Sequence, residues 1–297
     1  MKRISETQMV VRRCGLAALL ALLLAVPFPV NEDDSIAFSR EFVAPVPGTL
    51  VICGGGDMPE PVLRRFVDAA GGTKARIVVV TTASETADSP SEVEDDLEFW
   101  RSLNPASLTV LHTRSSEEAN DPDFARPLLT ATGIWFLGGK QAWLTDTYLG
   151  TLTERLIHGV LKRGGAIGGE SAGAAIMSAV MIRRGDPNPE VGRGFGFLPG
   201  TVIDQHFLTR HRQDRLMNVL SSHPGLVGLG IDEGTALIVQ GRYLKVLGDS
   251  QVVACLSPSA DRPASVKMLP SGSEADLVKL SRAANSRKPA VRQSVLR

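Results

Sequence analysis

A serine stands in a glycine-rich stretch near the middle of the chain, in the segment GGESAGA at residues 168–174. Residues 169–173 fit the pattern G-x-S-x-G, in which a serine lies on a sharp turn between a strand and a helix and exposes its hydroxyl. Small neighbours allow the backbone to make such a turn. The pattern therefore makes Ser171 a candidate nucleophile. Short patterns recur by chance, so two alternatives are retained: a tight turn with a serine that has no catalytic role, and a phosphate-binding turn.

Glu170 gives this stretch the appearance of a carboxylesterase, and the residue order tests that interpretation. Esterases of the α/β-hydrolase class place an acid and then a late histidine after the serine. The histidines that follow Ser171 are at positions 206, 211 and 223, and none lies beyond them. The HGGG-type oxyanion motif is also missing upstream. The residue order therefore argues against an esterase.

A second segment, DQHFLTRHRQDR at residues 204–215, offers a general base. It begins at the expected end of a strand, which would hold His206 near the same sheet edge as Ser171. An imidazole is needed to take the serine proton. A structural histidine bonded within the strand end is the alternative. The arginines that follow either form a solvated helix face or include one that binds a substrate carboxylate.

Three acidic residues are candidates for the group that orients the imidazole. Glu233 begins a predicted strand, and Glu190 lies in the loop between the serine and the histidine. Asp204 stands two residues before His206 on what reads as one strand, which favours a role in supporting the pocket. The acid would fix the imidazole tautomer and stabilise the imidazolium. Each carboxylate could instead be a solvated surface group.

The first half of the chain alternates short apolar runs with helical patterns. Strands are expected at residues 50–53, 77–80, 108–111, 134–137 and 166–167, and helices at 59–70, from a capping box at 91–94, at 143–162 and at 172–182. This alternation predicts an α/β fold, with a three-layer, doubly wound and mostly parallel sheet. Ligands of such sheets bind beyond the carboxyl ends of the strands, where the glycines at 54–56 and 138–139 and Ser171 fall.

The second half has more strands. They are expected at residues 202–204, 229–231, 236–239, 243–246 and 252–256, with one helix around 213–221 and a hairpin turn at 240–242. We expect one domain over residues 45–260. The final stretch, 271–297, is rich in Ser, Ala and charge, and we expect it to be disordered.

Together these motifs resemble a known family. They are GGESAGAA at 168–175, DQHF at 204–207 with its trailing arginines, GIDEGTA at 230–236, and FLGGKQ at 136–141. They are similar to the cyanophycinase branch of the serine peptidase family that also contains aspartyl dipeptidase, over about residues 48–256. The resemblance implies a class I glutamine-amidotransferase-like fold with serine in place of the usual cysteine.

The activity implied by the resemblance is hydrolysis of peptide bonds next to aspartate. Cyanophycinases cut β-aspartyl-arginine links in the polymer cyanophycin and release dipeptides. Carried over by motif, Ser171 is the nucleophile and His206 the general base, with Glu233 the preferred acid and Glu190 the second candidate.

The resemblance also implies a set of groups around the reacting bond and requires no metal or cofactor. The oxyanion hole would use the backbone N–H groups of Gly139 and Ala172. The expected substrate contacts, all polar or charged, are Gln205, Asp204, Arg210 and Arg215.

Two residues depart from the family pattern. Glu170 stands where Thr or Trp is usual, and Lys140 stands where Asn or Asp is usual. They could pair with each other, or they could recognise a substrate with a free amino terminus or an acidic group. We therefore include Lys140 among the candidate substrate contacts. Hydrolysis of an aspartyl or isoaspartyl bond is the broader expectation, and cyanophycin cleavage the narrower one.

The composition limits the partners. The 297 residues carry 32 Lys and Arg against 32 Asp and Glu, so the net charge is zero and no nucleic-acid surface is expected. The three cysteines follow no metal-binding spacing. Cys53 and Cys255 could form a disulfide, but burial of both as small hydrophobic residues is the preferred reading. A peptide or a cyanophycin-like polymer is the expected partner, and a homodimer is compatible with the sequence.

The N-terminus has the pattern of an export signal. A basic region containing Lys2, Arg3, Arg12 and Arg13 precedes an uncharged apolar run at residues 15–30. This run is short for a membrane-spanning helix and fits a signal peptide within residues 1–40. An uncleaved anchor is the alternative, and would be the only membrane contact. We expect a protein that works outside the cytoplasm, in the periplasm, the envelope or the medium.

The leading hypothesis is an exported serine exopeptidase. The alternative from another class is a non-catalytic protein that keeps the scaffold and binds a small acidic ligand in the arginine-lined cleft.

Overall fold

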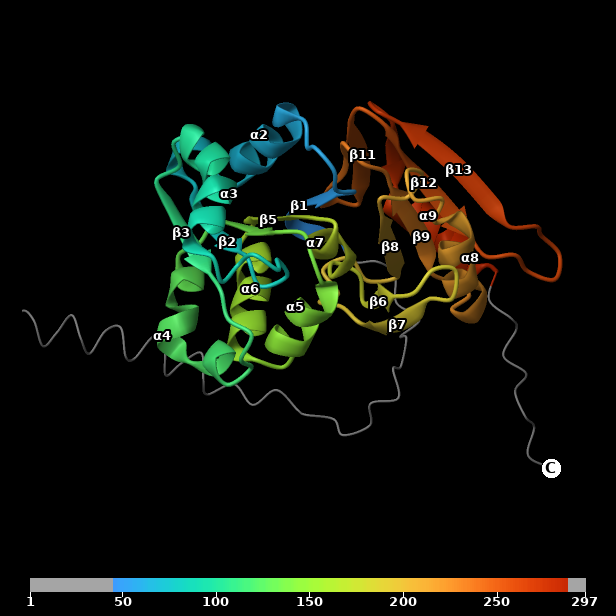
Figure 1. Cartoon of the computed structure of the whole chain (residues 1–297). Coiled ribbons are helices and arrows are strands. Elements are labelled where there is room, and N and C mark those ends of the chain that lie inside the picture. The colour runs from blue at the N-terminus through green and yellow to red at the C-terminus, as the bar shows by residue number, and fades with distance from the viewer. Residues whose placement is uncertain (1–44, 288–297) are drawn as a thin grey trace, which may run out of the picture. The chain divides into compact units, whose positions relative to one another are not determined.

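The computed structural model describes residues 45–287, so the predicted export segment at residues 1–40 lies outside the described residues. Within this range, eight strands form one sheet in the order β14-β11-β10-β1-β5-β4-β2-β3 (Figure 1). Five of its strands are parallel: β1 (Val46–Cys53), β2 (Arg76–Val80), β3 (Ser107–Leu111), β4 (Gly133–Phe136) and β5 (Ala166–Glu170). The predicted parallel α/β sheet is therefore confirmed.

Helices cover both faces of this sheet. One face packs against α2 (Glu60–Ala69) and α3 (Pro90–Ser102), while the other packs against α4 (Pro122–Ala125), α5 (Gln141–Tyr148), α6 (Leu152–Lys162) and α7 (Ala172–Ala175). Successive strand residues alternate between the two layers. Val51 packs with the α2 and α3 side chains, whereas Leu50 and Ile52 pack with those of α6. This is the three-layer arrangement expected from the sequence.

Three antiparallel strands extend the sheet beyond β1. They are β10 (Thr235–Gly241), β11 (Tyr243–Gly248) and β14 (Glu274–Asp276). The turn between β10 and β11 is the hairpin predicted at residues 240–242. The pairing of β10 with β1 brings the second half of the chain to the edge that carries the glycines at 54–56.

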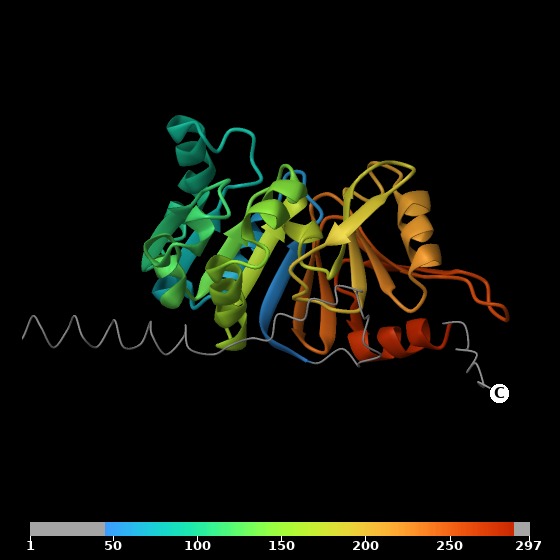
Figure 2. The same ribbon diagram turned by 90° about the horizontal axis from the view of Figure 1, so that it is seen from below.

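A second sheet packs beside the first. Its order is β13-β12-β9-β8, with β8 (Thr201–Gln205) parallel to β9 (Val227–Ile231), followed by β12 (Gln251–Leu256) and β13 (Ser265–Pro270). Its side chains on one face join the core of the main sheet, and those on the other pack under α8 (Gln213–Ser222). Figure 2 shows α8 on the side away from the main sheet.

The long helix predicted at residues 143–162 is wrong: the structure has two helices there. Leu149 is extended, Gly150 has φ +81°, and Thr151 starts α6 as its N-cap. The Thr151 hydroxyl accepts a hydrogen bond from the Glu154 N–H, and the Glu154 carboxylate accepts one from the Gly150 N–H. This reciprocal pattern is a variant of the capping box in which the glutamate accepts from the residue before the N-cap, and the residues T-x-x-E at 151–154 are its sequence signal.

Two other helix boundaries also differ. The helix expected at 172–182 ends at Ala175, and the chain continues into a hairpin of β6 (Val180–Arg184) and β7 (Glu190–Arg193). The Ser178 hydroxyl donates to the carbonyls of Ala175 and Val180, which stabilises the change of direction. Helix α3 begins at Pro90 rather than after a capping box at 91–94.

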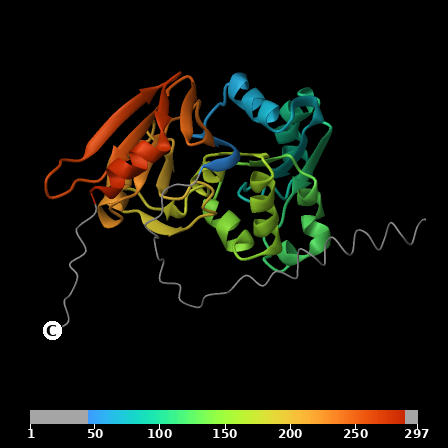
Figure 3. The same cartoon turned by 180° about the vertical axis from the view of Figure 1, so that it is seen from behind.

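The tail predicted to be disordered is ordered as far as residue 287. It forms β14 and then α9 (Leu277–Asn285), which packs on the second sheet (Figure 3). Asp276 caps this helix by accepting from the N–H groups of Val278 and Lys279, and Leu277 and Ala284 enter the core. The folded domain thus extends beyond residue 260. Residues 288–297 lie outside the described range.

Two further findings concern the part of the chain that the structure describes. None of its helices is both long enough and apolar enough to cross a membrane. Cys53 and Cys255 are buried free thiols, so the preferred reading of these cysteines is confirmed. Burial raises the pKa of the Cys255 thiol to about 11.

Candidate active site

The site lies where the carboxyl ends of several strands meet. Ser171 follows β5, Gly138 and Gly139 follow β4, and the glycines at 54–56 follow β1. The second sheet adds His206, directly after β8, and Glu233, between β9 and β10. The elements therefore bring together side chains that are up to 62 residues apart in the chain.

Ser171 sits in a strained turn between β5 and α7. Its φ of +50° and ψ of −106° are unusual for a residue with a side chain. The turn depends on small neighbours, because a Cβ on Gly169 would lie 2.8 Å from the Gly173 backbone. The Ser171 N–H donates to the Cys53 carbonyl at 3.1 Å, which ties the turn to β1. This is the geometry that the G-x-S-x-G pattern predicted.

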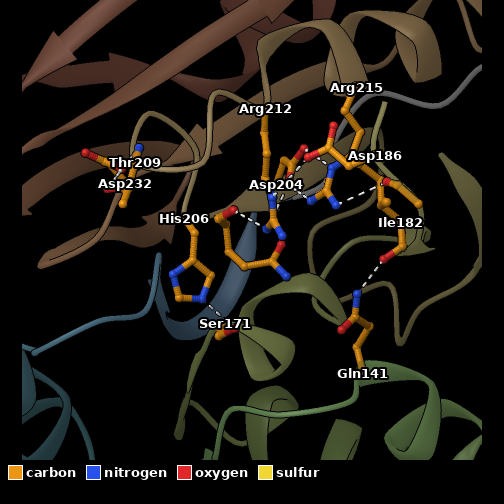
Figure 4. Close-up of polar contacts among 12 residues, drawn as sticks. Gln141, Ser171, Ile182, Asp186, Asp204, His206, Thr209, Arg212, Arg215 and Asp232 are labelled. Atoms are coloured by element: carbon orange, nitrogen blue, oxygen red, sulfur yellow. Dashed lines mark hydrogen bonds and ion pairs between the residues drawn. The ribbon is translucent and has the colours of Figure 1, made fainter. Parts of the chain in front are cut away.

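His206 lies between Ser171 and Glu233. Its Nε2 is 2.8 Å from Ser171 Oγ, and its Nδ1 is 2.6 Å from Glu233 Oε1. Figure 4 shows the imidazole directed at the serine. His206 is buried, and burial lowers its pKa, an effect that the Glu233 carboxylate partly offsets. The imidazole is therefore neutral at pH 7 and able to accept a proton.

The glycines after β1 form the surface against which this pair packs. A Cβ on Gly55 would lie 2.4 Å from His206 Cε1, and one on Gly56 would lie 2.9 Å from Glu233 Cβ. Both glycines have a positive φ, of +96° and +71°. The backbone is also bonded to the site, since Gly54 O accepts from the His206 N–H at 2.8 Å. These glycines lie at the sheet edge predicted from the sequence, and their role as a packing surface for the two side chains was not predicted.

The two residues predicted for the oxyanion hole belong to segments that flank the nucleophile. A Cβ on Gly138 would lie 3.5 Å from Ser171 Cβ, so the Gly138–Gly139 segment passes beside the serine. Gly139 has φ +127°, and any Cβ there would overlap the Ala83 carbonyl. Ala172 is the first residue of α7, where backbone N–H groups have no intrahelical partner.

Asp204 and Arg215, both predicted as substrate contacts, instead form a buried ion pair. Arg215 Nε donates to Asp204 Oδ2 at 3.0 Å, and its Nη2 contacts the other carboxylate oxygen. The side chains are 0% and 4% exposed, which leaves no surface for a ligand. Arg212 lies beside them, with Nη1 3.7 Å from Asp204 Oδ1 (Figure 4). Burial raises the pKa of Asp204, and Arg215 counteracts this effect. The pair joins α8 to β8.

The other predicted substrate contacts are placed differently. Arg210 is exposed, and its charge lowers the pKa of His206, which puts it close to the imidazole. Gln205 is buried next to His206, and among the described residues its Oε1 is one of the buried side-chain oxygens without a hydrogen-bond partner. The exposed position of Arg210 is compatible with contact to a substrate, whereas Gln205, 5% exposed, leaves as little surface for a ligand as Arg215.

Lys140 directly follows the Gly138–Gly139 segment and is exposed. Its Nζ is 2.5 Å from Glu85 Oε1 and 4.3 Å from the centre of the Trp143 ring. Its acidic partner is thus Glu85, on the loop after β2. Whether Lys140 contacts a substrate stays a prediction.

Glu190 is not the acid that contacts His206. Its carboxylate accepts from Arg184 Nε at 2.6 Å within the β6–β7 hairpin, and it is 51% exposed. Of the candidate acids, the structure brings Glu233 to the imidazole. Asp232, which was not among the predicted site residues, binds the loop that follows His206.

No metal site accompanies these residues. Over residues 45–287, no group of three or more His, Cys, Asp or Glu side chains is arranged to hold a metal ion. The site is made of a hydroxyl, an imidazole and a carboxylate in a line, which is the arrangement of a serine hydrolase triad.

Comparison with known proteins agrees with this geometry. Residues 50–247, more than half of the chain, match the model of peptidase family S51. The chain belongs to this family. Membership makes it a serine-type peptidase, and confirms the resemblance seen in the sequence.

Two relatives in the family are cyanophycinases. The one from Geminocystis herdmanii (strain PCC 6308) is 34% identical over 215 residues, which cover 68% of this chain and 78% of that protein. The one from Synechococcus elongatus is 32% identical over 236 residues, covering 75% and 73%.

A solved structure shares the fold. A peptidase from an acI-B1 Actinobacterium matches with a TM-score of 0.59 at 21% identity, over 81% of this chain and 100% of that one. The family and this neighbour agree with the predicted class I glutamine-amidotransferase-like fold.

The buried ion pair gives a stability prediction. Asp204→Ala should lower the free energy of unfolding by about 3–5 kcal/mol, because it leaves the Arg215 charge buried without its partner. Urea unfolding measures this change. Glu190→Ala is the matched control: it breaks an exposed ion pair, should cost less than about 1 kcal/mol, and should leave peptidase activity unchanged. Equal losses of stability in the two variants would contradict the assignment.

Proposed function

We propose that this chain is an exported serine exopeptidase that hydrolyses aspartyl or β-aspartyl peptide bonds. The observation that carries the proposal is the line of contacts from Ser171 Oγ to His206 Nε2 and from His206 Nδ1 to Glu233, at 2.8 and 2.6 Å. These distances lie within the range required for proton transfer. The cyanophycinase relatives support the substrate class.

The proposed reaction begins with attack of Ser171 Oγ on the carbonyl carbon of the scissile bond. His206 Nε2 takes the hydroxyl proton, and the Glu233 carboxylate holds the Nδ1 proton and stabilises the imidazolium. The N–H groups of Gly139 and Ala172 donate to the oxygen that becomes negative, a contribution of about 3–4 kcal/mol per donor in other enzymes.

The second half of the reaction uses the same groups. His206 returns its proton to the leaving amine, and an acyl group remains on Ser171. Water then attacks this ester with His206 as base, which releases the acid product and restores the serine. No step requires a cofactor.

Charge near the imidazole supports recognition of an acidic substrate. Arg210 is exposed near His206, and a guanidinium can bind a carboxylate through two parallel hydrogen bonds. This guanidinium fits a substrate that presents a carboxylate close to the reacting bond, as an aspartyl peptide does.

The catalytic proposal predicts that Ser171→Ala abolishes turnover and leaves the fold intact. Purified full-length protein would be offered cyanophycin, β-aspartyl-arginine peptides and α-aspartyl dipeptides in parallel, with product release followed by chromatography. Ser91→Ala, at an exposed serine of α3, is the matched control and should be fully active.

The outcomes separate substrate from mechanism. Serine-dependent release of β-aspartyl-arginine from the polymer would establish cyanophycin as a substrate. Cleavage of only the small peptides would agree with the proposed mechanism and would restrict the substrates to small aspartyl peptides. Activity that survives in Ser171→Ala, or no cleavage of any substrate by the native chain, would contradict the proposal.

Export rests on the basic and apolar pattern of residues 2–30. We expect protein recovered from the extracytoplasmic fraction of producing cells to begin after the apolar run, and N-terminal sequencing measures this directly. An intact N-terminus on protein in the membrane fraction would indicate an anchor instead. An intact N-terminus on cytoplasmic protein would refute export.

A further inference from the structure

The loop that carries the base has an unfavourable backbone conformation. His206 has φ +51°, in the left-handed region, at the point where the chain leaves β8. Such a conformation costs about 1–3 kcal/mol for a residue with a side chain and persists only when the surroundings determine it. The position of the imidazole therefore depends on whatever holds the residues just after it.

Asp232 holds those residues. Its Oδ1 accepts from the backbone N–H groups of Leu208 and Thr209 at 3.1 and 2.9 Å, and from the Thr209 hydroxyl at 2.9 Å. Its Oδ2 accepts from the Ser250 hydroxyl at 2.8 Å. Figure 4 shows Asp232 beside Thr209, apart from the Ser171–His206 contact. One carboxylate thus joins the His206 loop to the turn before β12.

The strength of this contact follows from burial and charge. Asp232 is 8% exposed. Burial alone would raise its pKa, but the hydrogen bonds from Thr209 and Ser250 outweigh it and lower the pKa. The group is therefore a carboxylate at neutral pH, and hydrogen bonds to an ionised acceptor are roughly twice as strong as neutral ones.

Asp232 is adjacent in the chain to the acid that contacts His206. The next residue is Glu233, which accepts from the imidazole. The connection that carries both acids is fixed in turn, because Asp232 N–H donates to Gln251 O at 3.3 Å and Gly234 N–H donates to Gly55 O at 3.0 Å. Two consecutive acids therefore bind the same loop. Glu233 contacts the imidazole ring of His206, and Asp232 contacts the backbone that follows His206.

We propose that Asp232 is a positioning residue for the reaction, which sets the imidazole of His206 between Ser171 and Glu233 by fixing the backbone at Leu208 and Thr209. This inference rests on the proposed function. Asp232 takes no proton and contacts no reacting atom. It acts through the loop.

The test compares Asp232→Ala with Asp249→Ala in the full-length protein. Asp249 is an exposed acid one residue from Ser250, in the same turn, and is the matched control. Asp232→Ala removes the hydrogen bonds to Leu208 and Thr209. It should lower kcat by about 10²-fold, the effect expected when the imidazole is displaced by about 1 Å, with KM changed much less. Asp249→Ala should keep the native kcat. Asp232→Asn keeps an oxygen toward Leu208 and Thr209, so its kcat should lie between those of the native chain and Asp232→Ala.

A second measurement reads the position of the imidazole without turnover. The proton between His206 Nδ1 and Glu233 should give a strongly downfield proton NMR signal, which His206→Ala would remove and so assign. Asp232→Ala should shift or broaden this signal, and Asp249→Ala should leave it unchanged. If Asp232→Ala does not fold, Asp232→Asn and Thr209→Val give the same comparison with smaller changes.

Two results would overturn the inference. One is a folded Asp232→Ala with kcat within about twofold of the Asp249→Ala control. The other is a loss of kcat with an unchanged downfield signal, since Asp232 would then act by another route. Retained activity in Ser171→Ala would instead refute the proposed mechanism, so the two failures are distinct.

Discussion

The hydrogen bond between His206 Nδ1 and Glu233 is the interaction on which the site depends. It joins the end of β8 to the connection between β9 and β10, and it turns Nε2 toward Ser171. The surrounding structure makes this bond possible in several ways. Gly55 and Gly56 leave room for the two side chains, Gly54 O accepts from the His206 backbone, and the buried Asp204–Arg215 pair fixes the helix that follows. The energetic cost is the left-handed backbone conformation of His206. Ser171, which contacts its imidazole, also has a positive φ.

The two sheets divide the chemistry between them. The parallel strands of the main sheet supply the nucleophile and the segments predicted for the oxyanion hole, and the second sheet supplies the base. Apolar side chains of both sheets, including Ile52 and Ile231, belong to one buried cluster. The triad therefore forms only when the second sheet packs on the first, and stability and activity are coupled through this shared core.

Sequence could identify Ser171 and His206, because each lies at a strand end and its residue type fits one task. The choice between Glu233 and Glu190 depended on strand register. Parallel pairing of Gln205 with Ile231 places Glu233 at the same edge as His206, and no spacing in the chain encodes that pairing. The same limit applies to the arginines. Arg215 and Arg210 are equivalent as charges in the sequence, but only the structure shows that Arg215 is buried against Asp204.

The prediction of a helix at 172–182 was wrong because its apolar residues fit a helical or an extended period equally well.

The most direct test of the account is the pH dependence of kcat/KM in the native chain and in Glu233→Gln, with an aspartyl peptide that the native chain cleaves. The reaction needs neutral His206, and burial lowers the pKa of this group below its usual 6.5, so activity should rise with pH and reach its plateau through a limb below pH 6.5. Glu233 raises that pKa, so its neutral replacement should move the limb to lower pH. The plateau should fall by about 10³- to 10⁴-fold, because the imidazole loses its orienting acid. An unchanged limb and plateau in Glu233→Gln would contradict the assignment of the triad.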